Sequence, residues 1–200
     1  SENTDVDIDT SMDDKNRKKS IRVMRVNHMG EVCAQALYRG QAMTTKDKDI
    51  KKELYKMCNE EKEHLNLCNK RLAELKGKTS LANPGWYASS FVLGCVAGIT
   101  SKKWGLGFIE ETEEQVTSHL NEYIDKLPSE DSISKDILIR IKEDEIQHKK
   151  SAEKIGSKEL PSQIKKGIYP TITTSEMTRF LLPLNEAINM VIDNIKYSKQ

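Results

Sequence analysis

The chain has 200 residues, enough for one domain with a sizeable buried core. Charged residues make up 32% of the chain, but the formal net charge at pH 7 is only +1, so the composition gives no reason to expect a nucleic-acid partner. With 10 glycines and 5 prolines among many Lys, Glu, Leu and Ile residues, the composition favours an all-α fold over a turn-rich β fold.

Residues 1–19 are predicted to form a disordered tail ahead of a helical domain at 20–200, because acidic and then basic residues leave almost nothing apolar to bury. This tail contains no apolar run typical of a cleavable signal peptide, and no transit peptide is visible. Trimming before Ser1 would remove a transit peptide, so this excludes no organelle. The four cysteines show neither C-x-x-C nor zinc-finger spacing, which favours a reducing intracellular compartment.

The first predicted helix runs from Ser20 to about Met43, where apolar residues recur at helical spacing. Small and apolar neighbours of Glu31 favour a buried carboxylate over a solvated one. Gly30 beside it costs roughly 1 kcal/mol against alanine in a helix, so we expect it to serve packing or access. His28 is assigned a structural or supporting role at best.

The second predicted helix covers roughly residues 46–76 and ends at Gly77. Glu61 and His64 fall on its apolar stripe. A carboxylate on the buried side of a helix needs a partner, and a metal cation would supply one. Three charged neighbours fall off the stripe and are interpreted as solvated, namely Glu60, Lys62 and Glu63.

Residues 81–109 differ from the rest of the chain because the part from Trp86 to Thr100 is apolar and rich in small residues. About 15 apolar residues are too few for a transmembrane helix, which needs about 20. We favour a membrane-interfacial segment with Trp86 and Trp104 at the headgroup level and the neighbouring lysines outside it. A buried core helix is a nearly equal alternative, and the two agree if one face packs inward while the other contacts lipid.

A fourth helix is predicted over residues 106–127, and it contains several glutamates together with His119. Periodicity alone does not decide which glutamate points inward. Glu113 lies at helical spacing from apolar residues on both sides, so it is the best candidate for the inward position, with Glu114 in reserve.

A fifth helix is predicted over residues 132–155, and it carries Glu145 and His148 on its apolar stripe. A loop at 156–174 and a last helix at 175–197 follow. The last helix is apolar on one side and is expected to cover the bundle.

The two Glu-x-x-His pairs are the main functional signal. A helix advances about 100° and 1.5 Å per residue, so each pair places a carboxylate and an imidazole where both reach one point. Glu61 follows Glu31 by 30 residues and Glu145 follows Glu113 by 32, so each pair comes after a further inward glutamate. Four helices with this ligand set are typical of carboxylate-bridged di-iron or di-manganese bundles.

The residue types suit such a centre. Four carboxylates neutralise two divalent cations and can bridge them, while each imidazole binds one ion, which favours Fe or Mn over thiolate-bound metals. A single Glu-x-x-His in a glutamate-rich chain would be weak evidence, but two of the four histidines occur in this motif.

The first helix also carries a longer pattern, with Arg-Val-Asn-His-Met-Gly-Glu at 25–31 and Tyr-Arg-Gly-Gln at 38–41. This pattern resembles the first-helix signature of the demethoxyubiquinone hydroxylases, which are ferritin-like di-iron proteins of ubiquinone biosynthesis. Both Glu-x-x-His pairs, the small-residue segment and the stretch from Glu113 to His119 follow in that family's order. The likeness covers roughly residues 21–155, and the last predicted helix is a weaker match.

The resemblance implies a ferritin-like four-helix di-iron bundle with additional membrane-interfacial and C-terminal helices. It implies a monooxygenase that hydroxylates the ring of demethoxyubiquinone with O₂ and electrons from NADH, as a peripheral protein on the matrix side of the mitochondrial inner membrane. A lipid-binding accessory protein would present the quinone within a ubiquinone-synthesis complex. His119 matches a histidine next to the ligands, and six residues match the ligands of two Fe ions: Glu31, Glu61, His64, Glu113, Glu145 and His148.

Some positions depart from the family's pattern. Met29 and Cys33 stand where small residues are expected, which predicts a tighter pocket. Leu120 follows His119 where the family usually has tyrosine, which puts a tyrosine role in electron or proton transfer in doubt. Small residues between 88 and 98 are expected to admit an isoprenoid tail from the bilayer.

Two other functions are alternatives to this one. Another ferritin-like di-iron function, such as iron oxidation and storage or peroxide reduction, would not need the apolar segment. A non-enzymatic membrane-surface helical module with solvated charges would not hold metal tightly.

Overall fold

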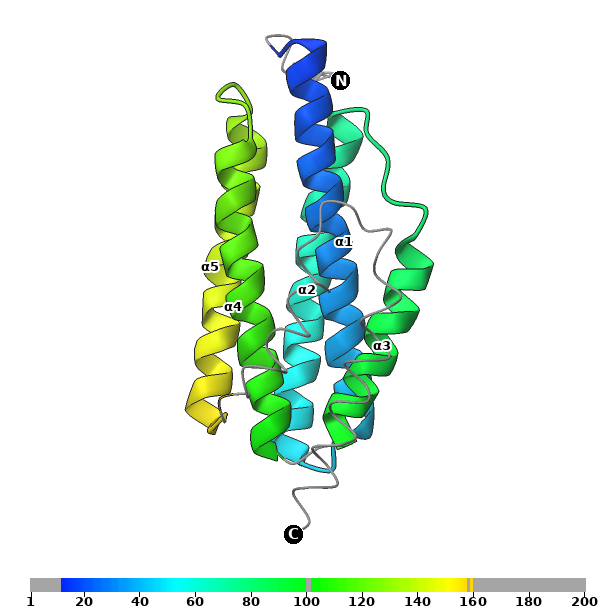
Figure 1. Ribbon diagram of the computed structural model, residues 1–200, viewed down its shortest axis with the longest axis vertical. Coiled ribbons are helices and arrows are strands. Elements are labelled where there is room, and N and C mark those ends of the chain that lie inside the picture. The colour runs from blue at the N-terminus through cyan, green and yellow to red at the C-terminus, as the bar shows by residue number, and fades with distance from the viewer. Residues whose placement is uncertain (1–11, 100–101, 158, 160–200) are drawn as a thin grey trace, which may run out of the picture.

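The computed structural model describes residues 12–99, 102–157 and 159. Over these residues the chain forms helices and no strand (Figure 1). The predicted last helix and nearly all of the loop before it lie outside the described residues, as do residues 1–11 of the predicted tail. The helices are α1 (Asp14–Thr44), α2 (Lys48–Glu74), α3 (Asn83–Ile99), α4 (Lys102–Lys126) and α5 (Ser132–Ile155).

Four helices, α1, α2, α4 and α5, form the bundle, and α3 connects its two halves. α1 and α2 pack as one antiparallel pair, and α4 and α5 pack as another (Figure 1). α3 runs back along α1, so α2 and α4 point the same way (Figure 1). One long crossover between two antiparallel pairs is the ferritin-like arrangement. The predicted all-α fold of this type is therefore confirmed.

The first helix begins at Asp14 rather than at Ser20, so the predicted tail of residues 1–19 was too long. Asp13 caps the helix by accepting a hydrogen bond from the backbone N–H of Asn16 at 2.7 Å. Asp14 pairs with Arg17 within the first turn. A cap and a charge pair stabilise these first turns without apolar residues. A prediction based on apolar content therefore misses them.

The ends of α2 and α5 follow ordinary capping rules. Asp47 accepts hydrogen bonds from two backbone N–H groups at the start of α2. α2 ends at Glu74, two residues before the predicted position, because Lys76 adopts a left-handed conformation with φ of 58°. α5 starts as predicted, with Asp131 capping Ser134 at 3.0 Å, and ends at Gly156 with φ of 103°.

α3 lies against the backbone of α1, and glycine makes this close approach possible. A Cβ atom on Gly94 would clash with the carbonyl oxygen of Leu37, and one on Gly98 would clash with that of Gln41. Thr44 of α1 donates a hydrogen bond to the carbonyl oxygen of Cys95 at 2.9 Å. The small residues thus serve helix packing, and at Gly94 and Gly98 they leave no passage for the expected isoprenoid tail.

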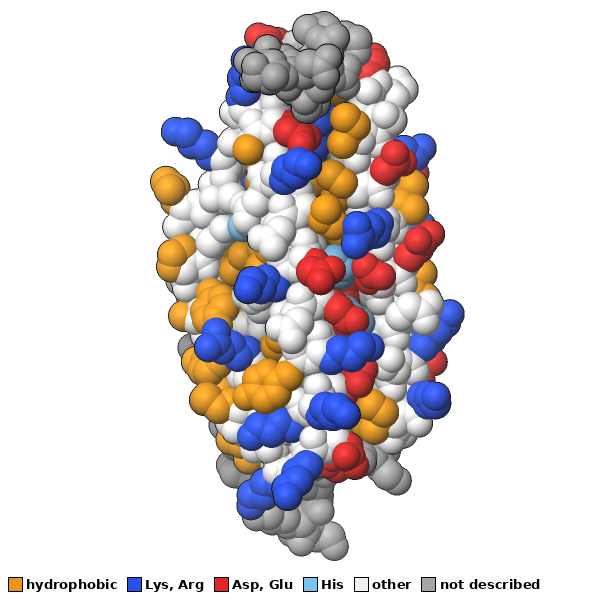
Figure 2. Space-filling view, turned by 180° about the vertical axis from the view of Figure 1, so that it is seen from behind, with side chains coloured by type: hydrophobic (Ala, Val, Ile, Leu, Met, Phe, Trp, Pro, Cys, Tyr) orange, Lys and Arg blue, Asp and Glu red, His pale blue; other side chains and the backbone are white. Residues whose placement is uncertain are grey.

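One face of α3 packs inward and the other is exposed. Trp86 is buried, with 8% of its surface exposed, so its predicted position at the headgroup level was wrong. Val92 and Ile99 are exposed on the outer face, at 47% and 68%. On the side of α3, hydrophobic side chains alternate with Lys and Arg (Figure 2). Among the described residues, every helix is too short or too polar to cross a membrane.

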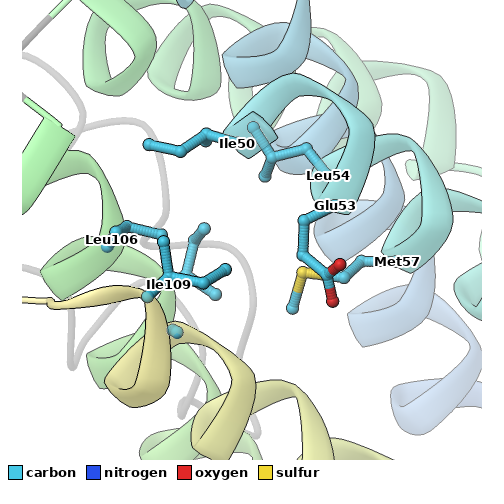
Figure 3. Close-up of a pocket in the computed structure, with 8 residues that line it drawn as sticks. Ile50, Glu53, Leu54, Met57, Leu106 and Ile109 are labelled. Atoms are coloured by element: carbon cyan, nitrogen blue, oxygen red, sulfur yellow. The ribbon is translucent and has the colours of Figure 1, made fainter. Parts of the chain in front are cut away.

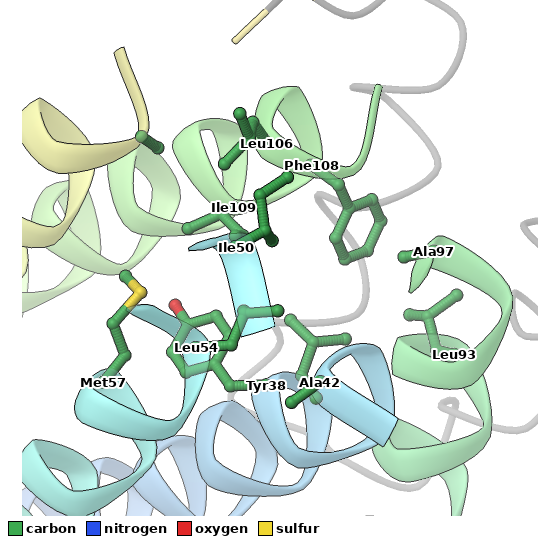
Figure 4. Close-up of a cluster of buried hydrophobic side chains, with 12 residues drawn as sticks. Tyr38, Ala42, Ile50, Leu54, Met57, Leu93, Ala97, Leu106, Phe108 and Ile109 are labelled. Atoms are coloured by element: carbon green, nitrogen blue, oxygen red, sulfur yellow. The ribbon is translucent and has the colours of Figure 1, made fainter. Parts of the chain in front are cut away.

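Two apolar clusters fill the bundle on either side of a polar layer. One cluster lies toward the C-terminal end of α1 and contains residues of all five helices (Figure 4). The other surrounds Met24, Cys68 and Leu138 at the opposite end. Glu31 lies between these clusters on α1, and Glu145 lies between them on α5. The polar layer is therefore enclosed by apolar side chains at both ends.

Candidate metal centre

The six predicted ligands come together in one buried layer. α1 and α4 each contribute one glutamate, and α2 and α5 each contribute a Glu-x-x-His pair. None of the six has more than 4% of its surface exposed. The layer consists of Glu31, Glu61, His64, Glu113, Glu145 and His148.

The layer divides into two overlapping groups. Glu31, Glu61, His64 and Glu145 offer ligand atoms that all lie within 4.8 Å of one another. The same limit holds for a second group, in which Glu113 and His148 replace Glu31 and His64. Glu61 and Glu145 belong to both groups. This geometry suits two cations that share two carboxylates.

Each histidine directs one ring nitrogen into the layer. His64 Nδ1 lies 3.5 Å from Glu31 Oε2, 3.4 Å from Glu61 Oε2 and 3.5 Å from Glu145 Oε1. His148 Nδ1 lies 2.9 Å from Glu145 Oε2, 3.5 Å from Glu61 Oε1 and 3.8 Å from Glu113 Oε1. Both Nδ1 atoms therefore face carboxylate oxygens from three helices.

The outer ring nitrogens reach across the bundle to carboxylates that sequence reasoning missed. His64 Nε2 lies 3.1 Å from Asp144 Oδ2 on α5, and His148 Nε2 lies 2.9 Å from Glu60 Oε2 on α2. The two contacts are reciprocal between α2 and α5. On the surface behind the view of Figure 1, Asp and Glu side chains gather around a histidine (Figure 2). A carboxylate on the outer nitrogen fixes the ring so that the inner nitrogen points at a metal.

A sequence signal for these two residues did exist. Glu60 directly precedes Glu61, and Asp144 directly precedes Glu145, so each Glu-x-x-His pair has an acidic residue before it. Both acidic residues fall off the apolar stripes of their helices, so periodicity gave no reason to place either in the site, and the structure leaves both partly exposed. Periodicity describes one helix at a time and does not show a contact to another helix.

Several polar atoms in the layer have no hydrogen-bond partner among the described residues. These are both carboxylate oxygens of Glu61 and one oxygen of Glu113. A buried polar atom without a partner costs about 1–3 kcal/mol. Two divalent cations bound by this layer would supply those partners. The residues present therefore fit a two-metal centre.

Protonation states in the layer reflect crowding of carboxylates in a buried space. Burial, together with the charge of Glu145, raises the pKa of Glu61 and of Glu113 well above the usual range. Burial alone would also raise the pKa of Glu145, but hydrogen bonds from His148 and His64 lower it to about 2. Burial opposes charge on His64 and His148, yet hydrogen bonds to Glu145 raise the pKa of both.

Burial shows which of Glu113 and Glu114 points into the layer. Glu113 has 1% of its surface exposed, whereas the Glu114 side chain is 59% exposed. Glu114 pairs with Lys149 at 2.6 Å on the outside of the bundle. α4 thus directs Glu113 into the layer.

Two further histidines lie outside both groups. His119 is buried and its ring lies 6.3 Å from that of Tyr123, and burial lowers its pKa. Its predicted supporting role stays a prediction. His28 has its Nδ1 3.4 Å from Asn83 Nδ2, and its structural or supporting role stays a prediction. Leu120 packs in the apolar cluster around Met24.

The cysteines do not compete with this ligand set. All four lie within the described residues as free thiols. Burial raises the pKa of Cys33 to about 11 and that of Cys58 to about 12, so both stay neutral at physiological pH. Cys33 and Met29 pack on Trp86, which accounts for the larger side chains at these two positions.

A buried layer of four glutamates and two histidines in a four-helix bundle with one long crossover is the arrangement typical of ferritin-like carboxylate metal centres, and the residues of this chain fit that class. The fold is similar to that of the bacterioferritin-related thioferritin of Bacteroides fragilis, with a TM-score of 0.57 at 19% identity over 69% of this chain and 84% of that chain. The family model described as Ubiquinone biosynthesis protein COQ7 matches residues 18–174. The chain belongs to this family.

Curated bacterial relatives support the same assignment. The chain is 42% identical to a protein of Azoarcus sp. over 157 residues, which is 78% of this chain and 76% of that protein. It is 50% identical to a protein of Dechloromonas aromatica over 143 residues, which is 72% of this chain and 69% of that protein. Both are named 3-demethoxyubiquinol 3-hydroxylase. A second family model, Polysaccharide biosynthesis protein, matches residues 159–200.

Proposed function

We propose that this chain is a 3-demethoxyubiquinol 3-hydroxylase, an oxidoreductase that adds oxygen to the ring of demethoxyubiquinol in ubiquinone biosynthesis. Family membership and the names of the relatives support this activity. The structural observation that carries it is the pair of overlapping ligand groups, which share Glu61 and Glu145 in a buried layer. Insertion of oxygen from O₂ into a ring position relies on a cofactor, and a metal pair held by this layer would be that cofactor.

The proposed cofactor is a pair of Fe ions. Glu31 and His64 would hold one ion, Glu113 and His148 would hold the other, and the two shared glutamates would bridge them. When bound, the iron pair supplies activation of O₂, with NADH as the proposed source of electrons. Ligands made only of carboxylates and imidazoles suit iron better than metals that prefer thiolates.

The protein's own residues contribute charge balance, orientation and dryness. Burial raises the pKa values of Glu61 and Glu113, so both would have to give up protons to hold cations. Glu60 and Asp144 hold the two imidazole rings in place from outside. The apolar clusters above and below the layer keep bulk water away from it.

The proposed partners follow from the chemistry of the substrate. An isoprenoid quinol resides in a bilayer, and the exposed residues Val92 and Ile99 of α3 would contact a membrane surface. A lipid-binding accessory protein and a ubiquinone-synthesis complex belong to the same proposal. We therefore propose that the chain binds to a membrane surface. Because the relatives named above are bacterial, they do not support a mitochondrial inner membrane, which stays a prediction of the resemblance alone.

Iron analysis combined with product analysis tests this function. Purified full-length chain, loaded anaerobically with Fe(II), should hold two ions and convert a demethoxyquinol with NADH and O₂ to its hydroxylated product. Glu61→Ala should lose iron and product together, because both ions depend on this side chain. The control Glu114→Gln should keep both, since Glu114 faces outward. A chain that holds two irons but only oxidises Fe(II) or reduces peroxide would overturn the hydroxylase assignment.

A further inference from the structure

A small cavity lies in the apolar half of the bundle between α2, α4 and α5. Its empty volume is about 200 Å³, which includes its open mouth. The close-up shows Met57 and Glu53 of α2 on one side of the space and Leu106 and Ile109 of α4 on the other (Figure 3). The full lining is Ile50, Glu53, Leu54, Met57, Leu106, Ile109, Ala152 and Ile155.

The cavity begins one helical turn from the metal layer on three helices. Met57 precedes Glu61 by four residues, Ile109 precedes Glu113 by four, and Ala152 follows His148 by four. Four residues of α-helix advance about 6 Å. The inner wall of the cavity is therefore adjacent to side chains of the proposed metal centre on α2, α4 and α5.

The outer wall lies toward the bundle surface. Leu54, Leu106 and Ile155 continue from the inner wall by another turn of their helices, and Ile50 of α2 follows. Glu53 and Ile155 are partly exposed, whereas Met57 and Ile109 are buried. The residues that line the cavity thus run from one helical turn away from the metal layer to the partly exposed surface of the bundle.

The lining excludes water as the preferred occupant. Seven of the eight lining residues are apolar, and the single polar one, Glu53, lies at the partly exposed end. A buried water needs two to four polar partners, and an apolar cavity stays dry and takes apolar atoms instead. The enclosed space is about the size of one water molecule, too small for a substituted aromatic ring.

We propose that this cavity is the binding and transit site through which dioxygen reaches the metal layer. The inference rests on the proposed function, because that reaction consumes O₂ at this layer. Dioxygen is small and apolar, so it partitions into such a space without hydrogen bonds. Met57 lines the path next to Glu61, and its flexible side chain permits passage of a diatomic molecule.

A noble gas tests the site without any catalytic step. Crystals of the metal-free full chain are pressurised with krypton, a noble gas of about the size of O₂. We expect one krypton atom between Met57, Ile109 and Ala152. The variant Ala152→Leu fills this space and should lose the krypton peak. Wild-type crystals without krypton at this position would overturn the proposal whether or not the chain is a hydroxylase.

Steady-state kinetics on the iron-loaded chain then tests whether the molecule that uses the cavity is O₂. Ala152→Leu should lower kcat/KM for O₂ by about tenfold while KM for the quinol stays within about twofold. Leu106→Ala, which widens the outer cavity, should leave kcat/KM for O₂ at or above the wild-type value. Ile133→Ala removes an exposed apolar side chain of α5 and should change neither parameter. A rise in the quinol KM with unchanged kcat/KM for O₂ would show that the cavity serves the quinol instead.

Discussion

At the scale of single residues, the site depends on carboxylates outside the ligand set as well as within it. His64 and His148 have an imidazole nitrogen on each side of the ring, and Asp144 and Glu60 occupy the outer ones. The inward positions of both Glu-x-x-His pairs were predictable from apolar stripes, whereas periodicity left Glu113 only as the best candidate on α4. Glu60 and Asp144 were not predictable, since they are partly exposed and their partners lie on another helix.

Removing these outer carboxylates should loosen the metal centre without unfolding the bundle. Glu60→Ala and Asp144→Ala are each expected to weaken metal binding by about 10- to 100-fold, because the ring of the facing histidine loses its orientation. Competition with a chelator measures the affinity. The control Glu63→Ala removes an exposed carboxylate of α2 and should bind metal as the wild type does. Equal affinity in all three variants would show that the outer contacts position nothing.

At the scale of elements, some helical glycines allow a close contact with a neighbouring helix and others face open space, and the sequence does not distinguish the two cases. Gly94 of α3 touches the backbone of α1, whereas nothing lies within 4 Å of a Cβ atom built on Gly30. Of the two roles expected for Gly30 beside Glu31, close packing is therefore excluded, and access stays a prediction. Sequence spacing marks a small residue, but only the packing partner tells whether the space is used.

Alanine at the two glycines should shift stability in opposite directions. Gly94→Ala is expected to lower the free energy of unfolding by about 1–3 kcal/mol, because its Cβ would overlap the Leu37 carbonyl. Gly30→Ala should raise it by up to about 1 kcal/mol, because alanine restricts the unfolded chain and meets no neighbour. Urea unfolding measures both. A stabilised Gly94→Ala would contradict the close approach of α3 to α1.

A buried ion pair joins α2 to the start of α5. Arg71 donates to Asp131 Oδ1 at 2.6 Å and to Ser134 Oγ at 2.9 Å, and both charged residues are at most 3% exposed. Burial raises the pKa of Asp131, but hydrogen bonds from Ser20, Ser134 and Arg71 outweigh this and hold its pKa below the usual range. The pair therefore contributes stability above the ordinary pKa of aspartate and loses it as pH falls through the lowered value.

Neutralising Asp131 should expose this contribution. Asp131→Asn is expected to cost about 3–5 kcal/mol at neutral pH, because Arg71 is left as a buried charge without its partner. The loss relative to wild type should shrink in acid, where the wild-type carboxyl also becomes protonated. Denaturant unfolding at a series of pH values tests both statements. A constant difference at all pH values would mean that Asp131 acts only as a helix cap.

At the scale of the whole molecule, two helix pairs meet around a polar layer between apolar clusters. The all-α fold and its helices were predictable because apolar residues recur at helical spacing over long stretches. The course of α3 was not, since an apolar segment suits a protein core and a membrane surface alike. In the structure, one face of α3 packs against α1. The remaining apolar residues of α3 lie on its exposed outer face.

The metal-free protein should lose stability as pH rises from about 5 to about 8. Burial and nearby charge raise the folded pKa of Glu61, and hydrogen bonds to glutamates raise that of His64 and His148, so the unfolded chain releases these protons first. Iron binding should remove this dependence, because cations replace the protons. Thermal unfolding across this pH range, with and without Fe(II), measures the effect. Rising stability in the metal-free protein would contradict the assigned protonation states.

Diffraction from crystals of the iron-loaded full chain, recorded on both sides of the iron absorption edge, tests the metal centre most directly. We predict two anomalous peaks in the buried layer, one bound by Glu31 and His64 and the other by Glu113 and His148. Both should lie against Glu61 and Glu145. A single peak, or iron bound elsewhere on the chain, would contradict a shared two-metal centre.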